Sequence, residues 1–222
     1  MPTPVDSAAE TREILLAANA ILSDDHYVYI SGDHGSGWID KDAIFVDLQR
    51  TRRLGQLLAQ AVADTGAEIV CGPATGGLIV AQWTAVELGL PAVFAEHNSP
   101  RSRAELRGRF DLHRGYDQLV AGRRVLIVDD VINTGFSARQ TVDAVRNCGG
   151  SVVAVGALVH RGNVTAAGLG VERYTYLLEH YIPAWPADQC PLCHQRRPIN
   201  TRFAHGEDFL DEAAERAGPH FS

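Results

Sequence analysis

The sequence lacks several features that would assign it to a specialised class of protein. It has only four cysteines in 222 residues, and positive charge is scarce, with 20 Lys and Arg against 27 Asp and Glu. Four cysteines are too few for a disulfide scaffold in a chain of this length, which favours reduced thiols. The formal charge of −7 argues against a nucleic-acid-binding protein, although a local basic patch can still bind phosphate.

Long apolar runs are also missing. No stretch of about 18 apolar residues occurs, so the sequence predicts no membrane span. The first residues, MPTPVDSAAETREILL, have no basic segment followed by an apolar one, and we therefore expect no signal peptide and a cytoplasmic protein. The length suits one large domain, or one domain with small additions.

What the sequence does contain is a regular alternation of predicted strands and helices. Short apolar runs such as AEIVCG, PAVFAEH and RRVLIVDD alternate with helical segments such as LIVAQWTAVELG and SARQTVDAVRNCGG. This order predicts an α/β fold, in which crossover helices cover a parallel sheet.

The N-terminal part has a different pattern. Residues 7–26 are predicted to be helical, with a capping box from Ser7 and Glu10, and residues 48–66 form a second helix that Gly66 ends. Between them, YVYISGDHGSGWIDKDAIF predicts a β-hairpin or a glycine-rich hood. We expect His34, within GDHG, to support a turn.

Two of the predicted strands end in unusual loops, and ligands of open parallel sheets bind at such ends. GPATGG, residues 72–77, enters a helix, so its glycines allow close approach of the backbone and its N–H groups attract phosphate. On its own this pattern is equally compatible with an ordinary turn.

The second loop follows the most apolar strand, in VLIVDDVINTGFS. Thr134, Gly135 and Ser137 offer hydroxyl and N–H groups for a phosphate at the start of a helix. Asp129 and Asp130 point to opposite faces if the strand continues, and carboxylates beside a phosphate site indicate a ligand with hydroxyls or Mg²⁺.

These two loops resemble signatures of the type I phosphoribosyltransferases, which use phosphoribosyl diphosphate (PRPP). VLIVDDVINTGFS is similar to their PRPP signature, with Asn133 at a position where Thr, Ser or Ala is usual, and GPATGG is similar to their pyrophosphate loop. The resemblance covers roughly residues 25–165. It implies a single domain over 1–222, with a twisted parallel sheet flanked by helices in a core at about 47–165. It also implies a small hood, formed by about 24–46 and the tail, 166–222.

Within this family, the chain most resembles the orotate phosphoribosyltransferases. The hood segment and VHRG are similar to theirs, and Arg161 matches their base-binding Arg. Two differences stand out: Ile30 replaces a Lys, and the mobile loop, AEHNSPRSRAELRGRFDLHRG, has no lysine. The cationic candidates that remain in this loop are His97, Arg101, Arg103, Arg107, Arg109, His113 and Arg114.

The resemblance implies transfer of 5-phosphoribosyl from PRPP to orotate, giving orotidine 5-phosphate for pyrimidine biosynthesis. The catalytic residues it implies are Asp129, Asp130, Arg101 and Arg103. The two acids are expected to hold the ribose hydroxyls directly or through Mg²⁺, and the two arginines are expected to close over the diphosphate. Arg161 contacts the base. The remaining PRPP-binding residues are Lys41, Ala74, Thr75, Gly76, Gly77, Val131, Ile132, Asn133, Thr134, Gly135, Phe136 and Ser137.

The family also implies a homodimer with small-molecule substrates and neither nucleic acid nor membrane as partner. Two other functions stay open. The acceptor could be a purine or another base, or the protein could sense PRPP as a regulator without catalysing transfer.

Cys190 and Cys193 have the spacing of half a zinc site. No second CxxC exists, and His194 and His205 are the residues that could complete four ligands. The alternatives are a structural role without metal and a structural Zn²⁺. Cys71 lies on a predicted strand and is expected to be a buried thiol.

Overall fold

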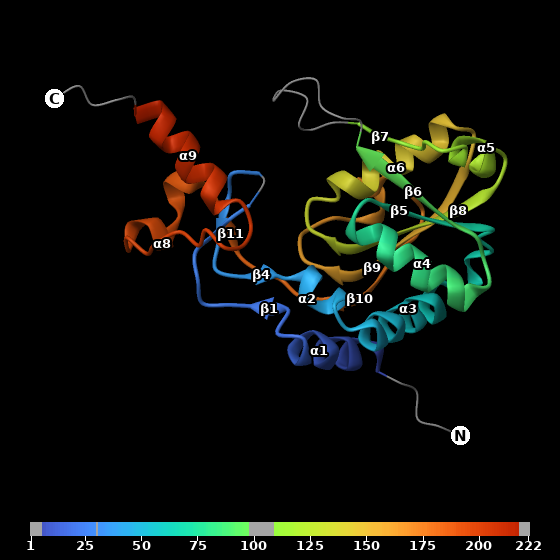
Figure 1. Cartoon of the computed structure of the whole chain (residues 1–222), viewed down its shortest axis with the longest axis horizontal. Helices are drawn as coiled ribbons and strands as arrows, with labels where there is room; N and C mark the ends of the chain where they lie inside the picture. Colours follow the sequence, from blue (N-terminus) through green and yellow to red (C-terminus); the bar gives the residue numbers. More distant parts are fainter. Residues whose placement is uncertain (1–5, 30, 98–108, 218–222) are drawn as a thin grey trace. The chain divides into compact units, whose positions relative to one another are not determined.

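The computed structural model describes residues 6–29, 31–97 and 109–217, and the chain divides into two compact units (Figure 1). The first, here called the sheet unit, comprises residues 1–14 and 41–180. The second, the hood unit, comprises residues 15–40 and 181–222. The sequence alone placed residues 166–180 with the hood, whereas the structure places them with the sheet, because they contain an edge strand.

A six-stranded sheet forms the centre of the sheet unit, in the order β10-β9-β8-β5-β6-β7. Its strands are β5 (Ile69–Pro73), β6 (Ala92–His97), β7 (Phe110–Asp111), β8 (Arg124–Ile132), β9 (Ser151–His160) and β10 (Tyr174–Glu179). All neighbours pair in parallel except β6 and β7. The predicted parallel sheet is confirmed. The central strands are buried on both faces, which explains why they read as continuous apolar runs.

Helices cover both faces of this sheet. The helices of the unit are α2 (Lys41–Phe45), α3 (Leu48–Val62), α4 (Gly76–Leu88), α5 (Tyr116–Val120), α6 (Phe136–Asn147) and α7 (Ala166–Leu169), with a 3₁₀ turn at Ala63–Thr65. On one face α3 packs against α4, and a Cβ at Gly55 would collide with Trp83. On the other face α6 packs on a core that includes Ile127, Val142 and Val155. None of the helices in the described ranges combines the length and apolar character needed to cross a bilayer.

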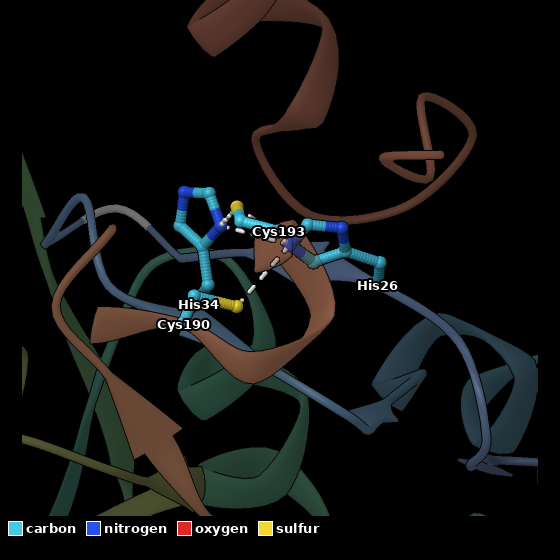
Figure 2. A group of neighbouring side chains, drawn as sticks. All are labelled: His26, His34, Cys190 and Cys193. Carbon is cyan, nitrogen blue, oxygen red and sulfur yellow. Dashed lines mark hydrogen bonds between the residues drawn. The ribbon is translucent and has the colours of Figure 1, made fainter. Parts of the chain in front are cut away.

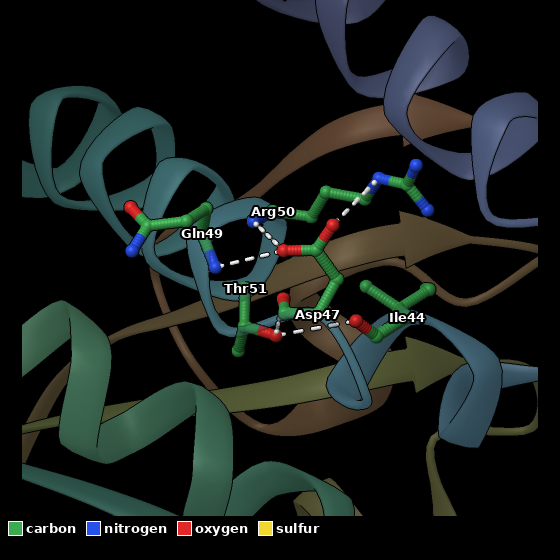
Figure 3. Close-up of polar contacts among 5 residues, drawn as sticks. All are labelled: Ile44, Asp47, Gln49, Arg50 and Thr51. Atoms are coloured by element: carbon green, nitrogen blue, oxygen red, sulfur yellow. Dashed lines mark hydrogen bonds and ion pairs between the residues drawn. The ribbon is translucent and has the colours of Figure 1, made fainter.

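A side-chain cap fixes the start of α3 (Figure 3). Asp47 accepts hydrogen bonds from the backbone N–H groups of Gln49 (2.9 Å) and Arg50 (3.2 Å). The hydroxyl of Thr51 donates to the carbonyl oxygens of Asp47 and Ile44. Asp47 thereby satisfies two of the N–H groups that a helix start leaves unpaired. At the other end Gly66 has φ 65°, which agrees with the predicted stop.

Helix α1 (Ser7–Ala17) is shorter than predicted and is capped by a different residue. Asp6, rather than Ser7, accepts from the N–H groups of Ala8 and Ala9. Apolar periodicity continues past Ala17, but Ile21–Leu22 pairs as strand β1 with β4 (Trp38–Ile39). The long-range pairing therefore overrides the local helical pattern.

Within the described residues, the hood unit contains strands of two residues and, apart from one twelve-residue helix, only short helical segments. Its elements are β1, β2 (Tyr27–Val28), β3 (His34–Gly35), β4, β11 (Ala184–Trp185), a 3₁₀ turn (Ala187–Gln189), α8 (Pro191–His194) and α9 (Gly206–Ala217). β3 pairs antiparallel with both β2 and β11, so the predicted hairpin accepts a strand from the tail. The N–H of Asn200 also donates to the carbonyl of His26 (2.7 Å).

We expect Asp47→Ala to lower the free energy of unfolding by about 1 kcal/mol, because two N–H groups of α3 lose their acceptor. Denaturant unfolding followed by circular dichroism measures this change. Asp143→Ala, at an exposed position within α6, is the matched control and should change stability by less than about 0.5 kcal/mol. Equal effects of the two variants would contradict the role of Asp47.

Candidate functional site

The two adjacent acids lie near the carboxyl end of β8. Strand pairing continues past them to Ile132, and the register places Asp129 beside Ala157 of β9. Because side chains alternate along a strand, Asp129 leaves β8 on the face of Ile127 and α6, and Asp130 on the opposite face. Each acid is only 7% exposed.

Both carboxylates lie against the glycines that begin α4. A Cβ at Gly76 would collide with Oδ2 of Asp130, and a Cβ at Gly77 would lie 2.9 Å from Oδ1 of Asp129. A Cβ at Gly72 would collide with the carbonyl oxygen of Gly77. The glycines of GPATGG are therefore required chiefly because the loop, the start of α4 and the two acids pack too closely for side chains at these positions. The Ala74–Thr75 peptide bond within it is cis.

Hydrogen bonds satisfy the acids only in part. The N–H of Asp130 donates to Oδ1 of Asp129 (2.9 Å), and the N–H of Val131 donates to Oδ1 of Asp130 (2.6 Å). Oδ2 of Asp130 is buried, and no residue in the described part of the chain donates a hydrogen bond to it. A buried oxygen in this state is available to a ligand hydroxyl or a metal-bound water.

Lys41, the first residue of α2, provides the nearby positive charge. Its Cδ lies 3.2 Å from the position of a Cβ at Gly76, and its ammonium pairs with Asp42 (3.0 Å). Burial alone would lower the pKa of Lys41, but the negative charges of Asp130 and Asp42 outweigh it and raise that pKa.

Burial dominates the electrostatics of the two acids. It raises the pKa of Asp130, and Lys41 offsets this only in part. Burial, and then repulsion from Asp130, raises the pKa of Asp129 well above its ordinary value. The pair is thus costly to ionise without a cationic or hydrogen-bonding ligand, a state typical of functional sites.

The segment 131–137 comprises the end of β8, the connecting residues 133–135 and the start of α6, and its geometry suits an anion. Gly135 has φ 72°, and α6 begins at Phe136, whose N–H donates to the Thr134 hydroxyl (3.4 Å). In the described ranges no group accepts from the N–H of Ser137 or Ala138. Free N–H groups at the start of a twelve-residue helix, with two hydroxyls beside them, suit a phosphate.

Arg161 lies next to this loop. It is 4% exposed, and its N–H donates to the carbonyl of Ile132 (2.9 Å). A Cβ at Gly162 would collide with the carbonyl oxygen of Asn133, so the VHRG strand end packs directly on the predicted phosphate loop. The charge of Arg161 also helps to lower the pKa of His180, after the larger effect of burial.

The sequence reasoning missed an aromatic group beside these acids. His160 bonds through Nδ1 to the hydroxyl of Tyr174 (3.0 Å) and stacks on Tyr176, with ring centroids 4.7 Å apart. Burial and then the charges of Tyr176 and Asp129 raise the pKa of Tyr174. The alternation in YTYLLE could have indicated that both tyrosines share one face with Asp129.

The predicted cationic loop is described only at its ends. Arg101, Arg103 and Arg107 lie outside the described residues, as does Ile30. Arg114 pairs with Glu96 (3.1 Å), and Arg109 pairs with Asp111 (3.5 Å). These two arginines are about 60% exposed and form surface ion pairs of small energetic value.

Cys190 and Cys193 lie close together in the hood unit, but their neighbours differ from those expected (Figure 2). The side chains grouped with them are His26 and His34. His194 is exposed, and His205 pairs with Asp208 (3.1 Å), so neither completes the group as predicted. Cys71 is a fully buried thiol whose pKa burial raises to about 12.

Comparisons with known proteins bear on the family and the fold of this chain. A family model described as Phosphoribosyl transferase domain matches residues 41–168. Orotate phosphoribosyltransferase of Desulforamulus reducens is 35% identical over 85% of this chain and 93% of its own, and that of Brucella ovis is 36% identical over 78% and 85%. A solved structure of Mycobacterium tuberculosis orotate phosphoribosyltransferase in complex with PRPP is 26% identical, covering 78% of this chain and 96% of that one, with a TM-score of 0.57. The resemblance expected from the sequence, and the fold it implied, are confirmed.

We expect Gly76→Ala to destabilise the protein by about 1–3 kcal/mol, because the added methyl group collides with the buried Asp130 carboxylate. Gly168→Ala in α7 is the matched control, since its Cβ would have ordinary contact with Thr165 and should cost little. Denaturant unfolding measures both.

A double-mutant cycle tests the cause. Asp130→Ala removes the colliding carboxylate and should recover part of the loss in Gly76→Ala, with a coupling free energy of roughly 0.5–3 kcal/mol. Strict additivity of the two substitutions would contradict the packing argument.

Proposed function

Because the chain belongs to the phosphoribosyl transferase family, we propose that it transfers 5-phosphoribosyl from PRPP to orotate, giving orotidine 5-phosphate and pyrophosphate. The observation that carries the proposal is the buried Asp129–Asp130 pair between the GPATGG loop and the 131–137 loop. The relatives named orotate phosphoribosyltransferase, at 33–36% identity over most of the chain, favour orotate as the acceptor.

The donor would be held by its three polar parts. We assign the 5-phosphate to the segment from Val131 to Ser137, with its free N–H groups. The ribose hydroxyls are assigned to Asp129 and Asp130, and the pyrophosphate to the loop from Ala74 to Gly77. Oδ2 of Asp130, buried without a donor in the described ranges, fits a ribose hydroxyl or a water molecule bound to Mg²⁺.

Mg²⁺ is the cofactor that this donor set suits, since carboxylate oxygens and phosphates are its preferred partners. When bound, it would neutralise negative charge on the diphosphate. In the transfer, the bond from ribose C1 to the pyrophosphate oxygen breaks as a bond to a ring nitrogen of orotate forms, and the proton of that ring N–H passes to the released pyrophosphate or to solvent. Positive charge develops on the ribose, as in glycoside cleavage, and the two carboxylates stabilise it.

The remaining roles rest on charge. We assign Lys41, whose ammonium is near Asp130, to a phosphate of PRPP, and Arg161 to the anionic base. Arg101 and Arg103 are proposed to neutralise the diphosphate as catalytic groups, by resemblance to the family loop. A homodimeric assembly and a cytoplasmic location are proposed on the same basis.

Incubation with PRPP, Mg²⁺ and orotate, followed by orotate absorbance, tests the reaction. We expect PRPP-dependent loss of orotate with stoichiometric pyrophosphate. If pyrophosphate is released only with a purine or another base, that base and not orotate is the acceptor. PRPP binding without turnover on any base would indicate a PRPP sensor instead of an enzyme.

We expect Asp130→Asn to reduce kcat/KM by at least roughly 100-fold, because the ribose and the metal-bound water lose a charged partner. Steady-state kinetics measures this loss, and Asp143→Asn on the exposed face of α6 is the control. Unchanged turnover in Asp130→Asn would show that the site is elsewhere.

The same variant has a pH signature in the free protein. Folding raises the pKa of Asp130 above its ordinary value of 3.8. Ionisation of this carboxyl therefore destabilises the folded protein progressively as the pH rises from 3.8 through the raised pKa. Asparagine does not ionise, so the Tm of Asp130→Asn minus that of the wild type should increase over this pH range and then level off. A difference that stays constant or decreases with pH would contradict the direction of the shift.

A further inference from the structure

A compact group of four metal-ligating side chains lies in the hood unit, whereas the proposed catalytic residues belong to the sheet unit. It consists of His26, His34, Cys190 and Cys193, whose ligand atoms all lie within 4.8 Å of one another. His26 and His34 come from the N-terminal hairpin, and the two cysteines from the turn that begins α8 (Figure 2). We propose that this group binds a structural Zn²⁺ ion with two nitrogen and two sulfur ligands.

The spacing of the ligand atoms suits a tetrahedral ion. Sγ of Cys193 lies 3.3 Å from Nδ1 of His34 and 3.7 Å from Nε2 of His26, and Sγ of Cys190 lies 3.6 Å from the same Nε2. Zinc bonds of about 2.3 Å to sulfur and about 2.0 Å to nitrogen place tetrahedral ligands about 3.3–3.8 Å apart. Nε2 of His26 and Nδ1 of His34 are 2.8 Å apart and need to separate only slightly.

A second contact orients His26 as a ligand. Its Nδ1 lies 2.9 Å from the carbonyl oxygen of Arg197, which can only accept, so Nδ1 carries the hydrogen. In the neutral ring, Nε2 then presents its lone pair to the sulfur atoms. A carbonyl partner on the outer nitrogen is the usual arrangement around a metal-bound histidine.

Burial also favours a bound ion. Cys190 and His34 are fully buried, and His26 is 1% exposed. Cys193 is partly buried. All four cysteines of the chain are free thiols, so Cys190 and Cys193 are not joined by a disulfide. Burying polar groups costs free energy unless they are satisfied, and a zinc ion would satisfy all four together. Since all four ligands come from the protein, no coordination position is left for a substrate, which makes the site structural.

The small size of the strands in the hood unit makes stabilisation by a bound ion physically reasonable. Its strands are two residues long, and it joins two segments, 15–40 and 181–222, that are far apart in sequence. Small units with little core depend on disulfides or metals for stability. Because the four ligands come together only in the folded unit, the free energy of zinc binding would add directly to the stability of that unit.

Metal analysis of the wild-type protein is the first test. After expression with added zinc and removal of loosely bound metal, we expect about one Zn²⁺ per chain. Replacement by Co²⁺ should give the visible absorption of a tetrahedral site with sulfur-to-metal charge transfer. Protein purified with less than about a tenth of an equivalent of zinc and no such Co²⁺ spectrum would overturn the proposal, and so would a Cys190–Cys193 disulfide found by thiol titration.

Variants identify the ligands. Cys193→Ser and His26→Ala should each weaken zinc binding by at least roughly 100-fold in competition with a chromophoric chelator, and Cys193→Ser should weaken the charge-transfer band. Cys148→Ser, at a free thiol of the sheet unit, and His194→Ala, next to Cys193 but exposed, are matched controls that should keep full affinity. Loss of binding in these controls, or none in the ligand variants, would refute the assignment. Every readout is independent of orotate turnover, so failure here leaves the proposed reaction untouched.

Discussion

The packing of two adjacent carboxylates under the glycine start of α4 is the constraint on which the rest of the sheet unit depends. Asp129 and Asp130 are 7% exposed, and the helix can begin beside them only because Gly76 and Gly77 have no side chains. Removing these acids from water makes their ionisation costly, and Lys41 relieves this only in part. Ionising the acids in the ligand-free site is therefore unfavourable. A ligand that brings hydroxyls and a cation would lower this free-energy cost.

The parts of this site that could be predicted are those that are contiguous in sequence. VLIVDDVINTGFS combines a strand, two acids and the proposed phosphate loop in thirteen residues, so the chemistry proposed for it follows from local order alone. Strand alternation assigned the two acids to opposite faces, and open-sheet geometry placed both loops at strand ends. What local order could not predict is that Gly76 and Gly77 leave room for the two acids, because that contact joins residues more than fifty positions apart.

The errors have the same origin. Apolar periodicity beyond Ala17 favoured a longer α1, but Ile21–Leu22 pairs with Trp38–Ile39, and periodicity alone carries no information on such partners. In the same way the CxxC spacing placed Cys190 and Cys193 close together, as the structure has them, but it could not identify the two histidines that lie beside them. His194 and His205 were suggested by nearness in sequence, whereas His26 and His34 come from the opposite end of the chain.

This separation also explains why the donor is better defined than the acceptor. Apart from Lys41 and the two loop arginines, Arg101 and Arg103, the groups assigned to PRPP lie at the ends of β5 and β8 and in the loops that follow, and the pairing of these two strands brings them together. The acceptor depends instead on single positions, above all Arg161, and a buried arginine beside a phosphate loop suits any anionic base. Orotate carries a carboxylate that a purine lacks, so a charge-specific contact at Arg161 would discriminate between them far more strongly than shape does. The proposed choice of acceptor therefore depends on Arg161. The similarity to orotate phosphoribosyltransferases is what supports orotate as the anionic base that Arg161 contacts.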